Sequence, residues 1–216
     1  MVKMLELLFQ LSVGFLIALS GVLIPGPLLA FISMKTLHSG PKTGTLAATG
    51  HIVVELGILS LVAFGLGSLL KNETFTQAIG TLGGLLLLGL GSIIIAKSKN
   101  TPESTQDIAG ISYHPLIGGI LYSTIFNPSV AIWWMSVGLV TLMGAVNEAG
   151  VIGGIFWIIG HFSADLGWFS AVSFSVDRGK KIIGGTFYKI LLIACGLTLL
   201  IFGIIFTVNY LPNLLF

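Results

Sequence analysis

Two pairs of ionisable residues lie inside long apolar stretches of the sequence. His51 and Glu55 are four residues apart, and so are His161 and Asp165. Residues at this spacing share one face of a helix, so each imidazole can reach its own carboxyl group. Burial disfavours the charged form of a carboxyl group, and an imidazole can share its proton or offset its charge. Each pair could therefore relay protons, bind a cation, or only bond His to acid and fix helix packing.

A carboxylate in the middle of a membrane helix is energetically costly. Glu55 and Asp165 are the acidic residues that the sequence places deep in apolar stretches. A central Asp costs about 2.5–3.5 kcal/mol on insertion scales, and a leucine would pack there without that cost. Ionisable residues within membrane helices usually mark ion or substrate pathways. We therefore interpret the two pairs as ion- or substrate-binding groups.

The composition is that of an integral membrane protein. Hydrophobic residues make up 55% of the 216 residues and charged residues 8%, whereas a soluble domain has about 25% charged residues. The mean hydropathy is +1.03. Four stretches without Lys, Arg, Asp or Glu exceed the roughly 20 residues that a helix needs to cross a bilayer: residues 7–34, 74–96, 108–147 and 190–216. The net charge of +2 forms no basic soluble face, so no nucleic-acid partner is expected.

The apolar pattern predicts six transmembrane helices. The longest polar stretch, residues 97–114, separates a first three-helix repeat (1–96) from a second (115–216). Lys and Arg gather in the loops after helices one, three and five, which the positive-inside rule places in the cytoplasm. We therefore expect a multi-pass protein of the cell membrane with both termini on the extracytoplasmic side. The helices are placed at about residues 5–34 with an internal break, 44–70, 75–96, 115–143, 149–175 and 183–209.

The two halves share a sequence pattern around the ionisable pairs. Residues 50–57 read Gly-His-Ile-Val-Val-Glu-Leu-Gly, and residues 160–167 read Gly-His-Phe-Ser-Ala-Asp-Leu-Gly. Identical residues occur at four matched positions, and an acid meets an acid at a fifth. Because each half has an odd number of helices, the second half must run inverted relative to the first.

Each half also contains a proline break inside an apolar stretch. The first is Pro25-Gly26-Pro27 and the second is Asn127-Pro128. Proline lacks an amide donor and clashes with the preceding turn, so helices one and four should be kinked or unwound there. Inverted repeats with paired broken helices point to a substrate site near the bilayer midplane, where the repeats meet. The predicted fold is an all-α membrane protein of two inverted three-helix repeats.

Three smaller features have more than one interpretation. Trp133 and Trp134 are expected in an interfacial aromatic belt rather than around a cavity. Asn127 could offer its amide to a substrate or cap the helix that resumes after the break. Gly-x-x-x-Gly motifs beginning at Gly80 and Gly150 permit close helix contact. We expect that contact within one chain, a homodimer being the alternative.

These residues resemble the lysine-exporter (LysE/RhtB) family over nearly the whole chain. The resemblance rests on the two proline breaks and on Gly40 and Gly44 before the second helix. The Gly-His-x-x-x-acid pattern and the Trp pair are most similar to archaeal-type members. The family implies a six-span exporter driven by an ion gradient, typically for amino acids. The resemblance implies that the cavity-forming breaks consist of Pro25, Gly26, Pro27, Asn127 and Pro128.

One position departs from the family pattern. Many amino-acid exporters of this kind have Asp or Asn after the glycine of the second helix, where this chain has His51. The wider superfamily also includes exporters of divalent metals. Two imidazoles and two carboxylates could complete a four-ligand site of nitrogen and oxygen donors, so His51, Glu55, His161 and Asp165 are the alternative metal ligands.

The sequence therefore predicts a secondary transporter, namely a proton-coupled exporter of amino acids or similar small solutes. The expected partners are a small-molecule substrate, a coupling ion and the lipid bilayer, and no cofactor is expected. The alternative is a divalent-metal exporter. No His-Glu-x-x-His or Gly-x-Ser-x-Gly motif supports an enzyme. The candidate substrate- or ion-binding residues are Pro25, Gly26, Pro27, His51, Glu55, Asn127, Pro128, His161 and Asp165.

Overall fold

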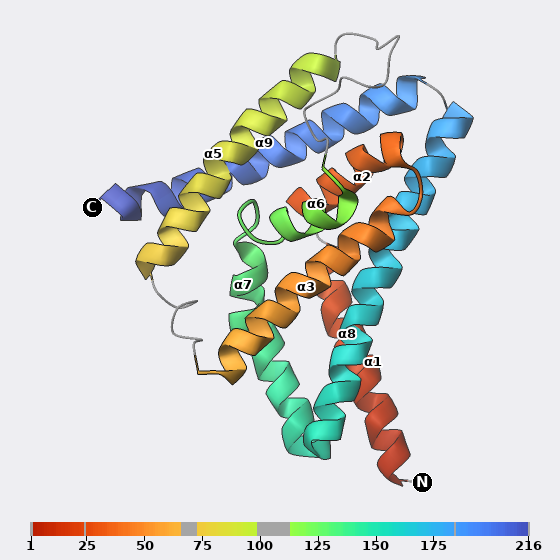
Figure 1. Ribbon diagram of the computed structural model, residues 1–216, viewed down its shortest axis with the longest axis vertical. Helices are drawn as coiled ribbons and strands as arrows, with labels where there is room; N and C mark the ends of the chain where they lie inside the picture. Colours follow the sequence, from red (N-terminus) through yellow and green to blue (C-terminus); the bar gives the residue numbers. More distant parts are fainter. Residues whose placement is uncertain (1, 24, 66–72, 99–112, 184, 216) are drawn as a thin grey trace. The chain divides into compact units, whose positions relative to one another are not determined.

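The protein is helical throughout the residues that the structure describes. This computed structural model describes residues 2–23, 25–65, 73–98, 113–183 and 185–215, and every regular element in these ranges is a helix (Figure 1). Four of the described helices are long and apolar enough to cross a membrane: Lys3–Val22, Thr43–Ala63, Leu139–Gly179 and Lys189–Leu211, with a shorter apolar helix at Gly80–Ala96. The predicted linker, residues 97–114, falls largely outside the described residues, as do Lys71 and Lys99.

The chain divides into two compact units. Unit 1 consists of Met1–Ile24 and Ser129–Trp168, and unit 2 consists of Pro25–Pro128 and Phe169–Phe216. Each unit combines segments from both sides of the predicted linker. Each unit also contains one of the two His–acid pairs, so the pairs are described separately below.

Unit 1 is built from three helical segments and a π-helical turn. They are α1 (Val2–Val22), α7 (Ser129–Trp133), the turn η1 (Trp134–Gly138) and the first part of α8 (Leu139–Ile183). Gly150 has a φ of 69°, so α8 is two helical runs and the chain reverses between them (Figure 1). Glycine adopts this conformation without steric cost. The interpretation of Gly150 as a close-contact glycine is therefore wrong, because it is a turn residue.

Within unit 1, glycines bring α1 and α8 into close contact. A β-carbon on Gly14 would collide with the carbonyl group of Trp157, and one on Gly160 would collide with the carbonyl group of Leu11. Small residues at such points let two helix backbones approach closely within a membrane. The pattern Gly-His in α8 thus begins at a point of helix contact.

Among its described residues, unit 2 contains five further helices and the end of α8. The helices are α2 (Pro27–Ser39), α3 (Thr43–Ala63), α5 (Glu73–Ser98), α6 (Pro115–Leu121) and α9 (Gly185–Leu215). Helices α5 and α9 lie side by side (Figure 1). Gly80 lies against the ring of Tyr210, and Gly84 lies against Thr207. The Gly80 motif therefore serves packing within the chain, as predicted.

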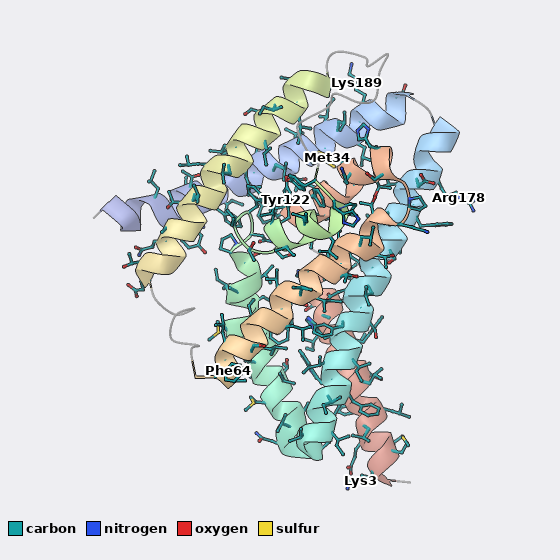
Figure 2. The ribbon with its side chains drawn as sticks, in the orientation of Figure 1. Lys3, Met34, Phe64, Tyr122, Arg178 and Lys189 are labelled. Carbon is teal, nitrogen blue, oxygen red and sulfur yellow. The ribbon has the colours of Figure 1, made fainter. Side chains whose placement is uncertain are left out.

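The interior of unit 2 is aromatic around α2 and α6. Phe31 and Tyr122 are both fully buried, and their rings stack with centroids 4.7 Å apart. A β-carbon on Gly118 would collide with the ring of Phe31. Figure 2 shows Met34 and Tyr122 inside this unit, whereas Arg178 extends outward. The contact between α2 and α6 therefore depends on a glycine facing an aromatic ring.

Both predicted helix breaks are present. Helix α1 ends at Val22 and α2 begins at Pro27, so the first apolar stretch is two helices. Helix α2 continues to Ser39, beyond the predicted end at residue 34. Helix α6 ends at Leu121 and α7 begins at Ser129, with turns between them. Proline at the start of α2 fits because the first helical residue has no intrahelical use for its amide.

Candidate functional site

The first His–acid pair lies on the buried face of α3 in unit 2. His51 Nε2 is 3.4 Å from Glu55 Oε1, and the two residues are only 6% and 2% exposed. Ala47, Ala48 and Ile58 are buried with them, and all five residues follow the helical period of one face. The predicted pairing at a spacing of four is confirmed.

The second nitrogen of His51 contacts a residue that sequence analysis missed. Ser123 Oγ lies 2.8 Å from His51 Nδ1, and Ser123 is 2% exposed. The ring of Phe169 meets the imidazole edge-on, with centroids 6.0 Å apart. The one sequence signal for Ser123 is its place in a short polar run just before the second break. That signal does not identify His51 as its partner, because 72 positions separate the two residues.

Unit 1 contains the second pair in a similar local geometry. His161 Nε2 is 3.4 Å from Asp165 Oδ2, and the residues are 2% and 0% exposed. Both lie in the second run of α8, after the turn at Gly150. The second predicted pairing is therefore also confirmed.

Three tryptophan rings surround His161. Trp157 stacks on the imidazole with centroids 5.3 Å apart and an interplanar angle of 13°. Trp133 and Trp134 lie at 5.1 and 5.0 Å from the same ring. Trp134 and Trp157 are fully buried. The prediction of an interfacial belt is wrong for Trp134, and we call the three rings the tryptophan cage. Trp157 precedes His161 by four residues, a spacing that could have revealed this neighbour.

A π-helical turn begins at one member of the tryptophan cage. The turn η1 begins at Trp134, and the amide of Leu139 donates to the Trp134 carbonyl group. A π-helix inserts one residue into the helical period, and such turns are frequent at functional sites. Trp133, the last residue before the turn, and Trp134, its first residue, both contact the imidazole. The sequence gives no indication of this turn.

Each Gly-His pattern packs against a helix from the other half of the sequence. In unit 2, a β-carbon on Gly50 would collide with the carbonyl group of Leu116 on α6. In unit 1, a β-carbon on Gly160 would collide with the carbonyl group of Leu11 on α1. The glycine of each pattern therefore has the same kind of backbone contact within its own unit.

The first break places its three residues at the start of α2. Gly26 is the residue before the helix, with extended backbone angles, and Pro27 is the first helical residue and is buried. Pro25 is exposed. The Gly26 carbonyl group accepts a hydrogen bond of 3.0 Å from the amide of Ala30.

The second break lies close in sequence to the serine that contacts His51. Asn127 is half-buried, and its backbone amide donates to the backbone carbonyl group of Thr124 at 3.2 Å. Pro128 is buried and directly precedes α7. Ser123 and Thr124 belong to the same turns. The second break and the first His–acid pair therefore belong to one unit and are linked through Ser123.

The chemistry available at each pair follows from its atoms. An imidazole can donate or accept a hydrogen bond, and a carboxyl group can do either depending on its protonation. A pair at 3.4 Å can therefore exchange a proton after a small movement. The same nitrogen and oxygen atoms are also ligands for borderline or hard divalent cations.

Fold and site together define a multi-pass helical membrane protein with buried ionisable pairs and broken helices. The family model described as LysE type translocator matches residues 19–210. The chain therefore belongs to the LysE-type translocator family. It is a membrane translocator and not an enzyme, and its family exports amino acids or other small solutes. No solved structure matches the chain.

Proposed function

We propose that the protein is a proton-coupled exporter of amino acids or similar small solutes, in which both His–acid pairs carry the coupling proton. The observation that supports this most strongly is the full burial of Asp165 beside His161, at 0% and 2% exposure. A buried carboxyl group is costly in a membrane helix and needs a functional reason to persist.

The matched geometry of the pairs supports the same role. His51 faces Glu55 at 3.4 Å, and His161 faces Asp165 at 3.4 Å. A carboxylate beside an imidazole can take up a proton and release it while the imidazole offsets the change in charge. Alternating protonation of the two acids would then drive the transport cycle.

The first break supplies a site for a substrate carboxylate. Helix α2 begins at Pro27, and the amide groups of its first turn lie at the positive end of the helix dipole. Broken helices in transporters direct such ends at anionic substrate groups. We propose that a carboxylate binds there, and that Asn127 and Pro128 shape the second break around the rest of the solute.

Flux measurements in proteoliposomes test the proposal. The purified protein is reconstituted with a trapped pH-sensitive dye, and each of the twenty protein amino acids is added singly. We expect at least one amino acid to drive proton movement in the wild type. Glu55→Gln and Asp165→Asn should reduce this signal to that of protein-free liposomes.

A matched carboxylate outside the pairs provides the control. Glu148 in unit 1 accepts a hydrogen bond of 2.7 Å from Gln10 and is exposed. Glu148→Gln should therefore retain proton-coupled flux. Normal coupled flux in Asp165→Asn would contradict the proposed role of the second pair.

Export of a divalent metal is the second candidate function, and the donor chemistry of the pairs favours it. Each pair presents imidazole nitrogen and carboxylate oxygen, ligands that suit several divalent cations. The same liposomes with a trapped metal-sensitive dye distinguish this candidate. Movement of Zn²⁺ or Mn²⁺, with no response to any amino acid, would replace the first proposal by the second.

A further inference from the structure

Ser123, His51 and Glu55 form a buried chain of polar side chains within unit 2. Ser123 Oγ is 2.8 Å from His51 Nδ1, and His51 Nε2 is 3.4 Å from Glu55 Oε1. The three residues are 2%, 6% and 2% exposed. The chain connects the segment that leads into the second break with the first His–acid pair on α3.

The hydroxyl group is suited to either protonation state of the pair. When Glu55 is ionised, it accepts from His51 Nε2–H, so Nδ1 accepts from the Ser123 hydroxyl. When Glu55 is protonated, its O–H can donate to Nε2, and Nδ1–H then donates to the Ser123 oxygen. A hydroxyl is both a donor and an acceptor. Ser123 can therefore keep the imidazole directed at Glu55 in both states.

The backbone around Ser123 belongs to the turns that form the second break. The amide of Ser123 donates to the carbonyl group of Ile120 at 3.2 Å, and the amide of Asn127 donates to that of Thr124 at 3.2 Å. The hydrogen bond between Ser123 and His51 therefore joins the turns of the second break to the imidazole of the first pair.

The second pair has no equivalent of this serine at the matched position. Gly50 contacts the Leu116 carbonyl group as Gly160 contacts that of Leu11. Ser123 lies seven residues after Leu116, and the residue seven positions after Leu11 is Ala18. Ala18 is 1% exposed. His161 contacts the tryptophan cage instead. The two pairs are therefore chemically different.

We propose that Ser123 is a positioning residue that holds His51 on Glu55 and couples the second break to the first pair. This inference rests on the proposed function, because it assigns the link between solute and proton to one of the two pairs. Removing the orienting partner of a functional histidine typically costs about tenfold to a hundredfold where the histidine binds a metal. We expect a loss in that range here for the initial rate of proton movement driven by an amino acid.

Three serine variants test the proposal. Ser123→Ala removes the hydroxyl, and Ser123→Thr retains it. Ser173→Ala is the matched control, because Ser173 is equally buried in unit 2 but bonds the backbone carbonyl groups of Pro41 and Ser170. Proton movement on addition of each protein amino acid is measured as above. The initial rate of proton movement driven by the amino acid should fall in Ser123→Ala and remain near wild type in Ser123→Thr and Ser173→Ala.

A spectroscopic measurement tests the positioning role without any solute. Protein labelled with ¹⁵N-histidine is placed in nanodiscs, and the His51 resonances are assigned as those lost in His51→Gln. Ser123→Ala should shift the Nδ1 resonance or mix the two tautomers, while Ser123→Thr should preserve the wild-type spectrum. Unchanged His51 resonances in folded Ser123→Ala protein would overturn the inference. Normal coupled flux in Glu55→Gln would instead overturn the proposed function. The effect of Ser123→Ala on the His51 resonances would still support the positioning role.

Discussion

The carbonyl oxygen of Leu116 occupies the space where a β-carbon of Gly50 would stand. This contact joins α6 to α3 one residue before His51, so the first pair lies directly beside the contact between these two helices. The contact of Gly160 with Leu11 does the same one residue before His161 in unit 1. The glycine of each Gly-His pattern is therefore a packing residue, and the histidine is the residue that contacts the acid.

Alanine at these two glycines should destabilise the protein. Gly50→Ala and Gly160→Ala force a methyl group into a neighbouring backbone, and such overpacking costs about 1–3 kcal/mol. The matched controls are Gly57→Ala and Gly167→Ala, since nothing lies within 4 Å of a β-carbon at either position. Thermal unfolding in detergent, followed by loss of the monodisperse peak, should separate the two sets. Equal stability in both sets would contradict the contact.

The turn at Gly150 gives a second stability prediction. Gly150 has a φ of 69° with open space around it, so Gly150→Ala should cost about 1–2 kcal/mol through backbone strain alone. Gly144 also has open space but lies within a helical run without a positive φ. Gly144→Ala should be neutral or slightly stabilising in the same unfolding assay. If Gly150→Ala were as stable as Gly144→Ala, the positive φ at Gly150 and the chain reversal there would be contradicted.

The tryptophan cage predicts a graded effect of side-chain size. Trp157 is fully buried and stacks on His161, and truncating a buried Trp to alanine costs about 3–5 kcal/mol. Trp157→Phe retains an aromatic ring and should lose much less stability than Trp157→Ala. Comparing the melting temperatures of the two variants checks the order. Similar losses for both would mean that stacking on the imidazole contributes little.

The predicted orientation in the membrane can be read by cysteine labelling. The native Cys195 is buried and is replaced first by Cys195→Ser. Lys3→Cys and Lys42→Cys then place single thiols at exposed positions. An impermeant maleimide applied to intact cells should label the first and not the second, because the positive-inside rule puts residue 42 in the cytoplasm. The reverse labelling pattern would invert the topology.

Local chemistry made part of the architecture predictable from sequence. Proline at residues 27 and 128 forbids a continuous helix, and both breaks are present. The spacing of four between His51 and Glu55 forces them onto one face, and they are in contact. Neither result depends on knowing which helices pack together. That independence explains why these predictions succeeded.

Features that depend on long-range packing could not be read from the residues. Ser123 meets His51 only because α6 lies against α3. Trp134 is buried beside His161, and the π-helical turn that begins at Trp134 has no signal in the sequence. Tryptophan and serine are common in both membrane interfaces and interiors, so residue type alone did not distinguish the two environments. The surroundings of each pair therefore had to come from the structure.

The central claim, that the His–acid pairs couple proton movement to solute export, is tested most directly by separating exchange from accumulation. Wild type and the double variant Glu55→Gln/Asp165→Asn are reconstituted, and the labelled amino acid that moves protons in the wild type is the probe. The double variant should still exchange labelled for unlabelled amino acid across the membrane. It should not accumulate the amino acid against its gradient when a proton gradient is imposed. Accumulation by the double variant at the wild-type level would contradict the account.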